Sequence, residues 1–164
     1  MEIEELEKDI ELEGVEIEEF DEGDYDEKVK EIRKQNDLYL EKFVEWLNNK
    51  GLSPKTIRNH VGNAEFYIND YLNYYDPTEM SDGCYHLDGY LGDWFIRKCM
   101  WSTGSSVKSN AASIKKFYLC MSELGYIEKN DYNYLCDEIK ECLDEWVDSV
   151  ESYNSGDFSF YDMF

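Results

Sequence analysis

Residues 51–60, with the sequence GLSPKTIRNH, hold the end of one predicted helix and the start of the next. Gly51 favours the C-terminal cap of a helix, because glycine readily adopts the left-handed backbone found there. Ser53 can act as the N-cap of a second helix, and Pro54 fits its first turn, where no backbone N–H is needed. The stretch therefore predicts a tight connection between two helices.

Apolar residues on both sides of this connection, and further along the chain, recur at three- and four-residue steps, as one face of a helix requires. We predict helices over residues 25–50, 53–75, 87–100, 105–124 and 131–150. Ser105 or Ser106 is the expected N-cap of the fourth helix and Asp131 that of the fifth, while residues 78–86 are typical of a loop. Because no repeated strand pattern occurs, the sequence predicts an all-α bundle of four to five helices.

Charge is distributed unevenly along the 164-residue chain. The 38 Asp and Glu residues against 16 Lys and Arg give a formal charge of -22, which excludes attraction of the whole molecule to phosphates or anionic lipids. Residues 1–27 hold 15 acids and one Lys, residues 28–127 hold 12 acids and 13 bases, and residues 128–164 hold 11 acids and two bases. Aromatic residues make up 16% of the chain, enough to bury a core. We therefore predict a nearly neutral folded body with acidic ends.

This distribution divides the chain into three predicted parts. Residues 1–27 form an acidic N-terminal arm, residues 28–131 a helical domain, and residues 132–164 an acidic helix with an aromatic tail that packs on the bundle. Alternating aromatics in the tail favour either an edge strand or an extended packed segment. The arm is either a solubilising tail, because crowded like charges oppose compaction, or a docking segment that covers a basic face.

Several classes of protein are not expected. The N-terminus lacks the pattern of a secretory signal and no apolar run approaches a membrane span, so we expect a cytoplasmic protein without membrane contact. An odd number of cysteines without a Cys-x-x-Cys pair favours reduced packing residues over disulfides or a zinc ribbon. These are Cys84, Cys99, Cys120, Cys136 and Cys142. We expect no cofactor, no metal site and no enzymatic activity, because no nucleophile with a recognisable base and no phosphate-binding glycine loop occurs.

Two motifs resemble the N-terminal core-binding domain of phage-integrase-type tyrosine recombinases, a small SAM-like helical bundle. The first is GLSPKTIRNH at residues 51–60, followed by Ala64, Phe66 and Ile68. The second is SSVKSNAASIKKFY at residues 105–118, followed by LGYI, and it is similar to the family's last core-binding helix and the turn beyond it. The resemblance implies this fold for residues 36–131.

The chain also departs from this family. Family members continue into a catalytic domain with arginines, a lysine, histidines and a tyrosine nucleophile, whereas no Arg or His follows Asp131 here. Arg33, Arg58 and Arg97 all precede that point, so the resemblance implies a DNA-facing surface and no strand cleavage by this chain.

In the resembled family, the second and fourth helices lie against the DNA groove. The residues that this places on DNA are Lys55, Arg58, Asn59, His60, Lys108, Asn110, Lys115 and Lys116. Lys and Arg neutralise phosphates, and Asn can bond a base edge or a phosphate.

We predict a non-catalytic DNA-binding module linked to integration or recombination, which the acidic ends can mask. The alternative is an acidic protein-interaction adaptor without DNA affinity, since helices expose Lys and Asn routinely. One contiguous basic face would favour DNA, and dispersed bases would favour the adaptor.

A second surface concerns the predicted third helix. Trp94 and Trp101 flank Arg97, and aromatic residues with Arg are frequent anchors of protein interfaces. These three residues are therefore candidates for contact with another protein chain, unless they pack in the core.

Overall fold

The computed structural model describes residues 22–156 and shows an all-helical protein, which confirms the predicted fold class. No strand occurs between these residues. The elements are α2 (Glu22–Asn49), α3 (Pro54–Glu65), η1 (Phe66–Tyr71), η2 (Met80–Tyr85), α4 (Leu87–Gly89), η3 (Tyr90–Trp94), α5 (Phe95–Lys98), α6 (Gly104–Glu123) and α7 (Lys129–Ser155). The predicted arm up to residue 21 and the tail at 157–164 lie outside the described residues. The SAM-like topology stays a prediction.

The connection quoted from residues 51–60 forms as predicted. Gly51 has a φ of 77°, and the Ser53 side chain accepts a hydrogen bond from the backbone N–H of Thr56 over 3.3 Å. Pro54 opens α3. α3 then continues into η1, a stretch of π-helix, so that the predicted second helix is one element with a change of winding.

Two predicted helix caps were wrong. α6 is capped by Thr103, not Ser105 or Ser106, because the Thr103 side chain and the Ser106 side chain bond each other's backbone N–H over 3.0 and 2.7 Å. α7 is capped by Glu128, and Asp131 stands three residues inside the helix, where its carboxylate bonds the Glu128 N–H over 3.2 Å. In each case the reciprocal pair satisfies two backbone donors.

The segment predicted as a loop, residues 78–86, contains the 3-10 turn η2. Met80 and Cys84 are buried in it. Two buried tyrosine hydroxyls hold its backbone, since Tyr67 donates to the Gly83 carbonyl over 2.5 Å and Tyr118 donates to the Met80 carbonyl over 2.8 Å. These bonds fix η2 although its sequence has no helical period.

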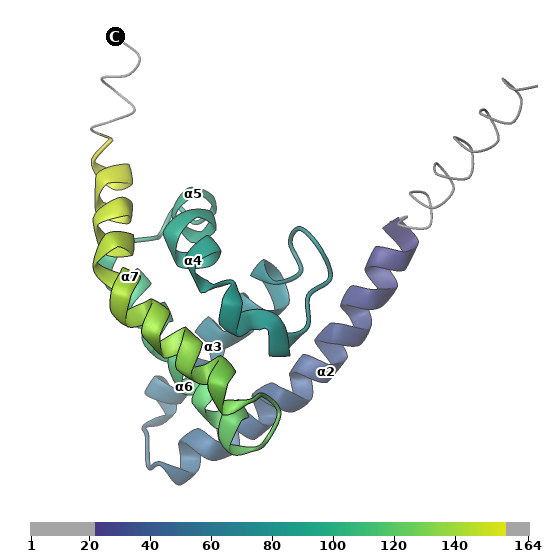
Figure 1. Ribbon diagram of the computed structural model, residues 1–164. Coiled ribbons are helices and arrows are strands. Elements are labelled where there is room, and N and C mark those ends of the chain that lie inside the picture. The colour runs from purple at the N-terminus through teal and green to yellow at the C-terminus, as the bar shows by residue number, and fades with distance from the viewer. Residues whose placement is uncertain (1–21, 157–164) are drawn as a thin grey trace, which may run out of the picture.

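The core is organised around α6, which packs against α2, α3 and α7 (Figure 1). Its buried aromatic residues Phe117 and Tyr118 meet Phe43 of α2 and Tyr67 of η1, with ring centroids 5.2 and 6.4 Å apart. Such edge-to-face pairs favour a fixed arrangement of the helices. α6 is therefore the central element that sets the position of its neighbours.

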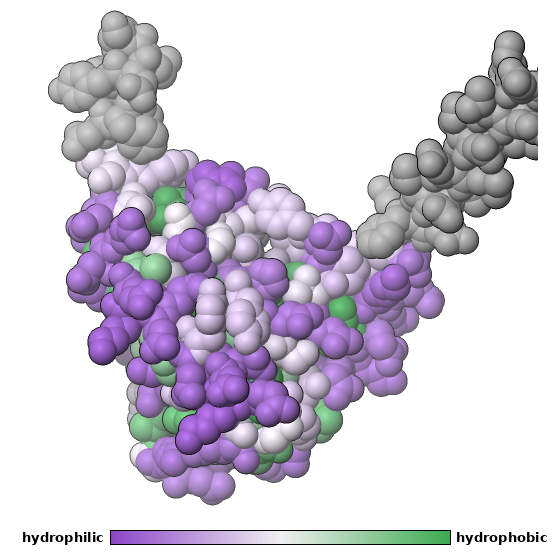
Figure 2. Space-filling model, in the orientation of Figure 1, coloured by the Kyte–Doolittle hydropathy of each residue, from purple (hydrophilic) through white to green (hydrophobic). Residues whose placement is uncertain are grey.

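α7 covers one side of α6 and of the segment from α4 to α5. Trp146 donates from its indole to Asp88 over 2.7 Å, and Asn154 donates to the Ser102 carbonyl over 2.7 Å. Hydrophilic side chains dominate the face in Figure 2, which has the orientation of Figure 1. Across residues 22–156, no helix combines the length and apolar character needed to cross a bilayer.

Candidate nucleic-acid interface

α3 and α6 lie side by side and antiparallel, so the two helices predicted to face DNA do form neighbouring parts of one surface. The ring Nδ1 of His60 lies 2.8 Å from the Ser113 hydroxyl. Asn63, further along α3, donates to Ser113 over 2.9 Å and to Ser109 over 3.3 Å. As α3 advances, its contacts move back along α6, which establishes the antiparallel order.

His60 belongs to the contact between these helices. Its ring is partly buried, and this burial, together with the positive charge of Lys116, lowers the pKa of His60 from its ordinary value of 6.5. The ring is therefore neutral near pH 7 and holds α3 to α6. It adds no positive charge to the surface, in contrast to the role that we predicted for it.

Asn110 was wrongly predicted to reach DNA. The side chain is 5% exposed and donates to the Ser106 carbonyl over 2.9 Å, while its oxygen accepts a bond from the Tyr90 hydroxyl over 3.4 Å. It stands three residues after Val107 and four before Ile114, on the buried stripe of α6. Asn110 is a polar residue of the core.

The remaining predicted residues are exposed on α3 and α6. They are Lys55, Arg58, Asn59, Lys108, Lys115 and Lys116. Within residues 22–156 the ion pairs join Lys28 to Asp24, Arg33 to Asp70 and Arg97 to Asp93, so none of the five cations of α3 and α6 is in one. Each α-helix contributes a single acid, Glu65 in α3 and Glu123 in α6. These cations are available to an external anion.

The five cations occupy three strips of this surface. Lys116 borders α3, because it follows by three residues Ser113, whose hydroxyl lies 2.8 Å from Nδ1 of His60. Lys108 and Lys115 border α7 instead, since they follow Gly104 by four and eleven residues, and Gly104 faces Glu151 and Val147 of α7. Arg58, two residues from His60, lies on the flank of α3 away from α6.

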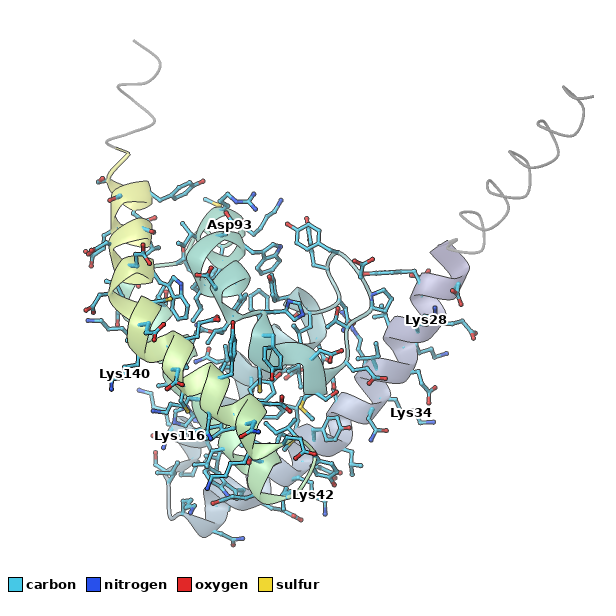
Figure 3. All side chains as sticks on the ribbon, in the orientation of Figure 1. Lys28, Lys34, Lys42, Asp93, Lys116 and Lys140 are labelled. Atoms are coloured by element: carbon cyan, nitrogen blue, oxygen red, sulfur yellow. The ribbon has the colours of Figure 1, made fainter. Side chains whose placement is uncertain are left out.

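The central strip is the best candidate for an anion. It carries Lys116 from α6 and, from α3, Asn59 and Lys55, which precede Asn63 by four and eight residues and so lie on the side of α3 where Asn63 contacts α6. The α7 border is less favourable, because α7 has eight acids against two bases and its Glu151 lies next to the first residue of α6. Lys28 and Lys34 project from α2 on the side of the molecule away from Lys116 (Figure 3).

Asn63 of α3 and Ser109 of α6, which we did not predict from the sequence, bond each other beside the central strip. We call this line of contact between the two helices the seam. Asn63 stands four residues after Asn59, so helical spacing could have placed both on one side of α3. Gly62 lies beside them, and a Cβ built there would have no neighbour within 4 Å. The seam is thus shallow and offers amide and hydroxyl groups.

The predicted contact through Trp94, Arg97 and Trp101 is corrected in part. Trp94 is 6% exposed and packs among the rings of Phe66, Tyr71 and Tyr74, so no partner chain reaches it. Arg97 is exposed and donates two hydrogen bonds to Asp93, over 2.8 and 3.0 Å. Trp101 is 62% exposed.

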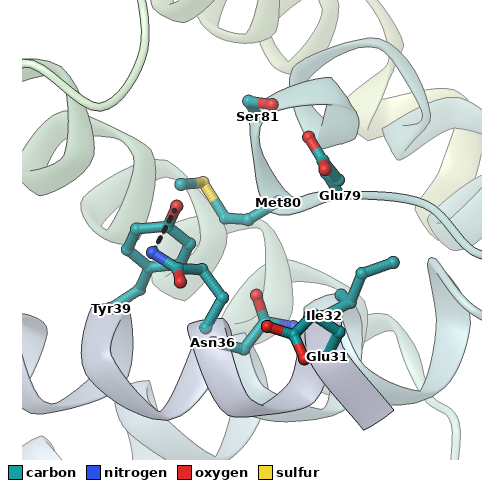
Figure 4. A pocket seen from close by; sticks show the side chains of 8 residues that line it. Glu31, Ile32, Asn36, Tyr39, Glu79, Met80 and Ser81 are labelled. Carbon is teal, nitrogen blue, oxygen red and sulfur yellow. Dashed lines mark hydrogen bonds between the residues drawn. The ribbon is translucent and has the colours of Figure 1, made fainter. Parts of the chain in front are cut away.

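A cavity of about 250 Å³ lies between α2 and η2 (Figure 4). Glu31, Asn36 and Tyr39 of α2 line it opposite Glu79 and Met80. Asn36 is 1% exposed and its side-chain oxygen has no partner among the described residues. The lining has no nucleophile paired with a base, so the cavity supports no catalytic assignment.

Three of the five cysteines, Cys84, Cys99 and Cys120, are buried. Burial raises the pKa of the Cys84 and Cys120 thiols to about 12 and that of Cys99 to about 11, so these groups stay protonated. Between residues 22 and 156, no three His, Cys, Asp or Glu side chains come together as a metal site requires.

Comparison with known proteins gave no match, either to a protein-family model, to a curated sequence or to a solved structure. The likeness to integrase core-binding domains therefore remains a prediction from the two motifs.

Proposed function

We propose that this protein is a non-catalytic DNA-binding module that contacts duplex DNA with the surface of α3 and α6. The observation that carries the proposal is the central strip, where the exposed cations Lys55 and Lys116 lie on two adjacent helices together with Asn59, and neither cation is in an ion pair with a described residue. A role as an accessory in DNA integration or recombination follows from the motif resemblance alone.

The central strip supports this function chemically. Lys55 and Lys116 can each neutralise a phosphate, and Asn59 and the seam residue Asn63 can bond phosphate or base-edge groups. Arg58 adds a cation on one flank. At physiological salt the Debye length is about 8 Å, so the acids on the far side of the molecule are largely screened from DNA at this strip. We expect weak binding with a shallow salt dependence, because few phosphates are neutralised.

The acidic ends of the chain supply a way to restrain this binding. Residues 1–27 carry 15 acids and one Lys. We propose that the arm competes with DNA for the cations of α3 and α6, since a tethered polyanion acts at a high local concentration.

A protein-interaction adaptor is the second candidate function. Met100 is fully exposed and Trp101 is 62% exposed, and both residue types are enriched at protein interfaces. The separation of the five cations of α3 and α6 into three strips, in place of one contiguous face, also favours this alternative. On this alternative, these cations are an ordinary solvated surface.

Fluorescence anisotropy with a labelled duplex tests the proposal on the full chain. We compare the wild type with Lys55→Gln/Lys116→Gln on the central strip and with Lys30→Gln/Lys34→Gln on α2, a control with the same change in net charge. All four side chains are exposed, so both variants should fold. We expect the strip variant to lose affinity and its log–log salt slope to fall by about 2, at about 0.9 for each phosphate contact.

The control variant should bind the duplex much more tightly than the strip variant. Absence of binding by the wild type in low salt, or equal losses in the two variants, would contradict the proposal. The first result would favour the protein-interaction adaptor.

A further inference from the structure

The connection between α5 and α6 exposes two large apolar side chains next to each other. Met100 is 100% exposed and Trp101 is 62% exposed. The Trp101 ring packs against the rings of Phe66 and Phe95, with ring centroids 6.1 and 6.4 Å away. We call Met100 and Trp101 the Met100–Trp101 patch. An exposed indole that packs on two phenylalanine rings beside a flexible thioether is typical of a surface that binds an apolar partner.

Cations border this patch. Arg97 and Lys98 form the last turn of α5, immediately before the connection, but Arg97 is already bonded to Asp93. The Lys98 ammonium lies 5.6 Å from the ring centre of Tyr74 and is in no ion pair with a residue between 22 and 156. The patch therefore fits a segment that combines aromatic side chains with carboxylates.

The end of α7 lies beside the same connection. Asn154, in the last turn of α7, donates a hydrogen bond over 2.7 Å to the carbonyl of Ser102, the residue after Trp101. Figure 1 shows the connection from α5 passing next to the final turns of α7. Gly156 then ends the helix with a φ of 70°, a left-handed cap.

Residues 157–164, which follow Gly156, have the sequence DFSFYDMF. They combine four aromatic residues and one Met with two Asp. This composition suits the apolar patch and its cationic border. A fully extended segment of this length spans about 26–29 Å, which allows it to cross from the end of α7 to Trp101. The tether also makes the binding intramolecular, so that modest contacts suffice.

We propose that residues 157–164 bind the Met100–Trp101 patch of the same chain. Phe158 and Phe160 cover the indole and the thioether, and the carboxylates lie toward Lys98. This inference does not depend on DNA binding, because the patch and the central strip are separate surfaces.

Nuclear magnetic resonance of the full chain, labelled at the tryptophan indoles and the methionine methyls, tests the proposal. The Trp101 indole signal is assigned by its loss in Trp101→Phe. We compare the wild type with Phe158→Ser/Phe160→Ser and with a control, Leu38→Ser/Leu124→Ser. The control removes two other exposed apolar side chains, 40% and 46% exposed.

We expect Overhauser contacts between the Met100 methyl and aromatic protons of the tail in the wild type, unchanged on dilution. The tail variant should lose these contacts and shift the Trp101 indole signal, whereas the control should do neither. Two results overturn the proposal: no such contacts together with an unchanged Trp101 signal in the tail variant, or contacts that vanish on dilution. The second result would assign the patch to a second copy of the chain.

Discussion

Nδ1 of His60 lies 2.8 Å from the Ser113 hydroxyl, in the middle of the contact between α3 and α6. The same hydroxyl accepts a hydrogen bond from Asn63 over 2.9 Å. Two polar side chains of α3 thus converge on one serine of α6. Because these bonds join the helices that carry Lys55 and Lys116, they fix the spacing of the two cations in the proposed DNA surface.

The lowered pKa of His60 makes the stability of this contact depend on pH. Above the ordinary His pKa of 6.5, the ring is neutral in both the folded and the unfolded chain. As the pH falls below 6.5, the unfolded chain takes up a proton more readily than the folded one, so the folded state loses stability until the lower folded pKa is passed. The wild type should therefore lose more stability than His60→Gln across this range, as measured by denaturant midpoints.

Lys116→Gln provides the control for this pH dependence. Burial remains, but the neighbouring positive charge is gone, so the pKa of His60 should rise toward 6.5 and the loss of stability on acidification should shrink. If the wild type and His60→Gln respond identically to pH, the ring does not hold the helices in its neutral form.

Local signals in the sequence specified much of the fold. Gly51, Ser53 and Pro54 adopt the roles that their backbone chemistry predicts. The choice of cap for α6 was harder, because Thr103, Ser105 and Ser106 all carry hydroxyls and only the pair three residues apart can bond reciprocally. The 3-10 turn η2 has no sequence period, since its position is set by Tyr67 and Tyr118 from distant elements.

The sequence predicted which charged side chains of the candidate site are exposed. It did not predict as well which neighbouring helix each of these side chains borders. Lys55, Lys116 and Asn59 are exposed, as long polar side chains on helices usually are. The errors concern His60, Asn110 and Trp94, which we predicted by residue type. Asn110 and Trp94 stand on apolar stripes of their helices and are buried, and His60 lies in the contact between α3 and α6. The separation of Lys108 and Lys115 from α3 depends on where α7 packs, which no local pattern gives.

The turn that Tyr118 anchors should not tolerate a side chain at Gly83. A Cβ at this position would overlap the Tyr118 hydroxyl and lie 2.9 Å from Cζ of the same ring and 3.0 Å from the Leu72 side chain. The Tyr118 ring is fully buried and its hydroxyl donates to the Met80 carbonyl, so it cannot move without breaking that bond. Gly83→Ala should lower the free energy of unfolding by about 1–3 kcal/mol, measured by denaturant titration.

Gly62→Ala is the matched control for the change at Gly83. Gly62 lies within α3, is exposed, and a Cβ there meets nothing within 4 Å. The substitution should raise the free energy of unfolding by about 0.5–1 kcal/mol, because alanine favours the helix over glycine. Equal effects of the two substitutions would mean that the packing of η2 against Tyr118 does not limit stability.

Restraint of DNA binding by the acidic arm is testable by removing charge without shortening the chain. Replacing the Glu residues of positions 2–19 with Gln leaves the length and the apolar residues of the arm unchanged. If the arm competes with DNA for Lys55 and Lys116, this variant should bind a duplex more tightly than the wild type at low salt. The difference should shrink as salt screens both interactions.

General repulsion between a negative chain and DNA would also be relieved, so the same substitutions must be made in the Lys55→Gln/Lys116→Gln background. There, competition for the strip predicts a much smaller gain, whereas general repulsion predicts an equal one, and an equal gain would refute the masking role of the arm.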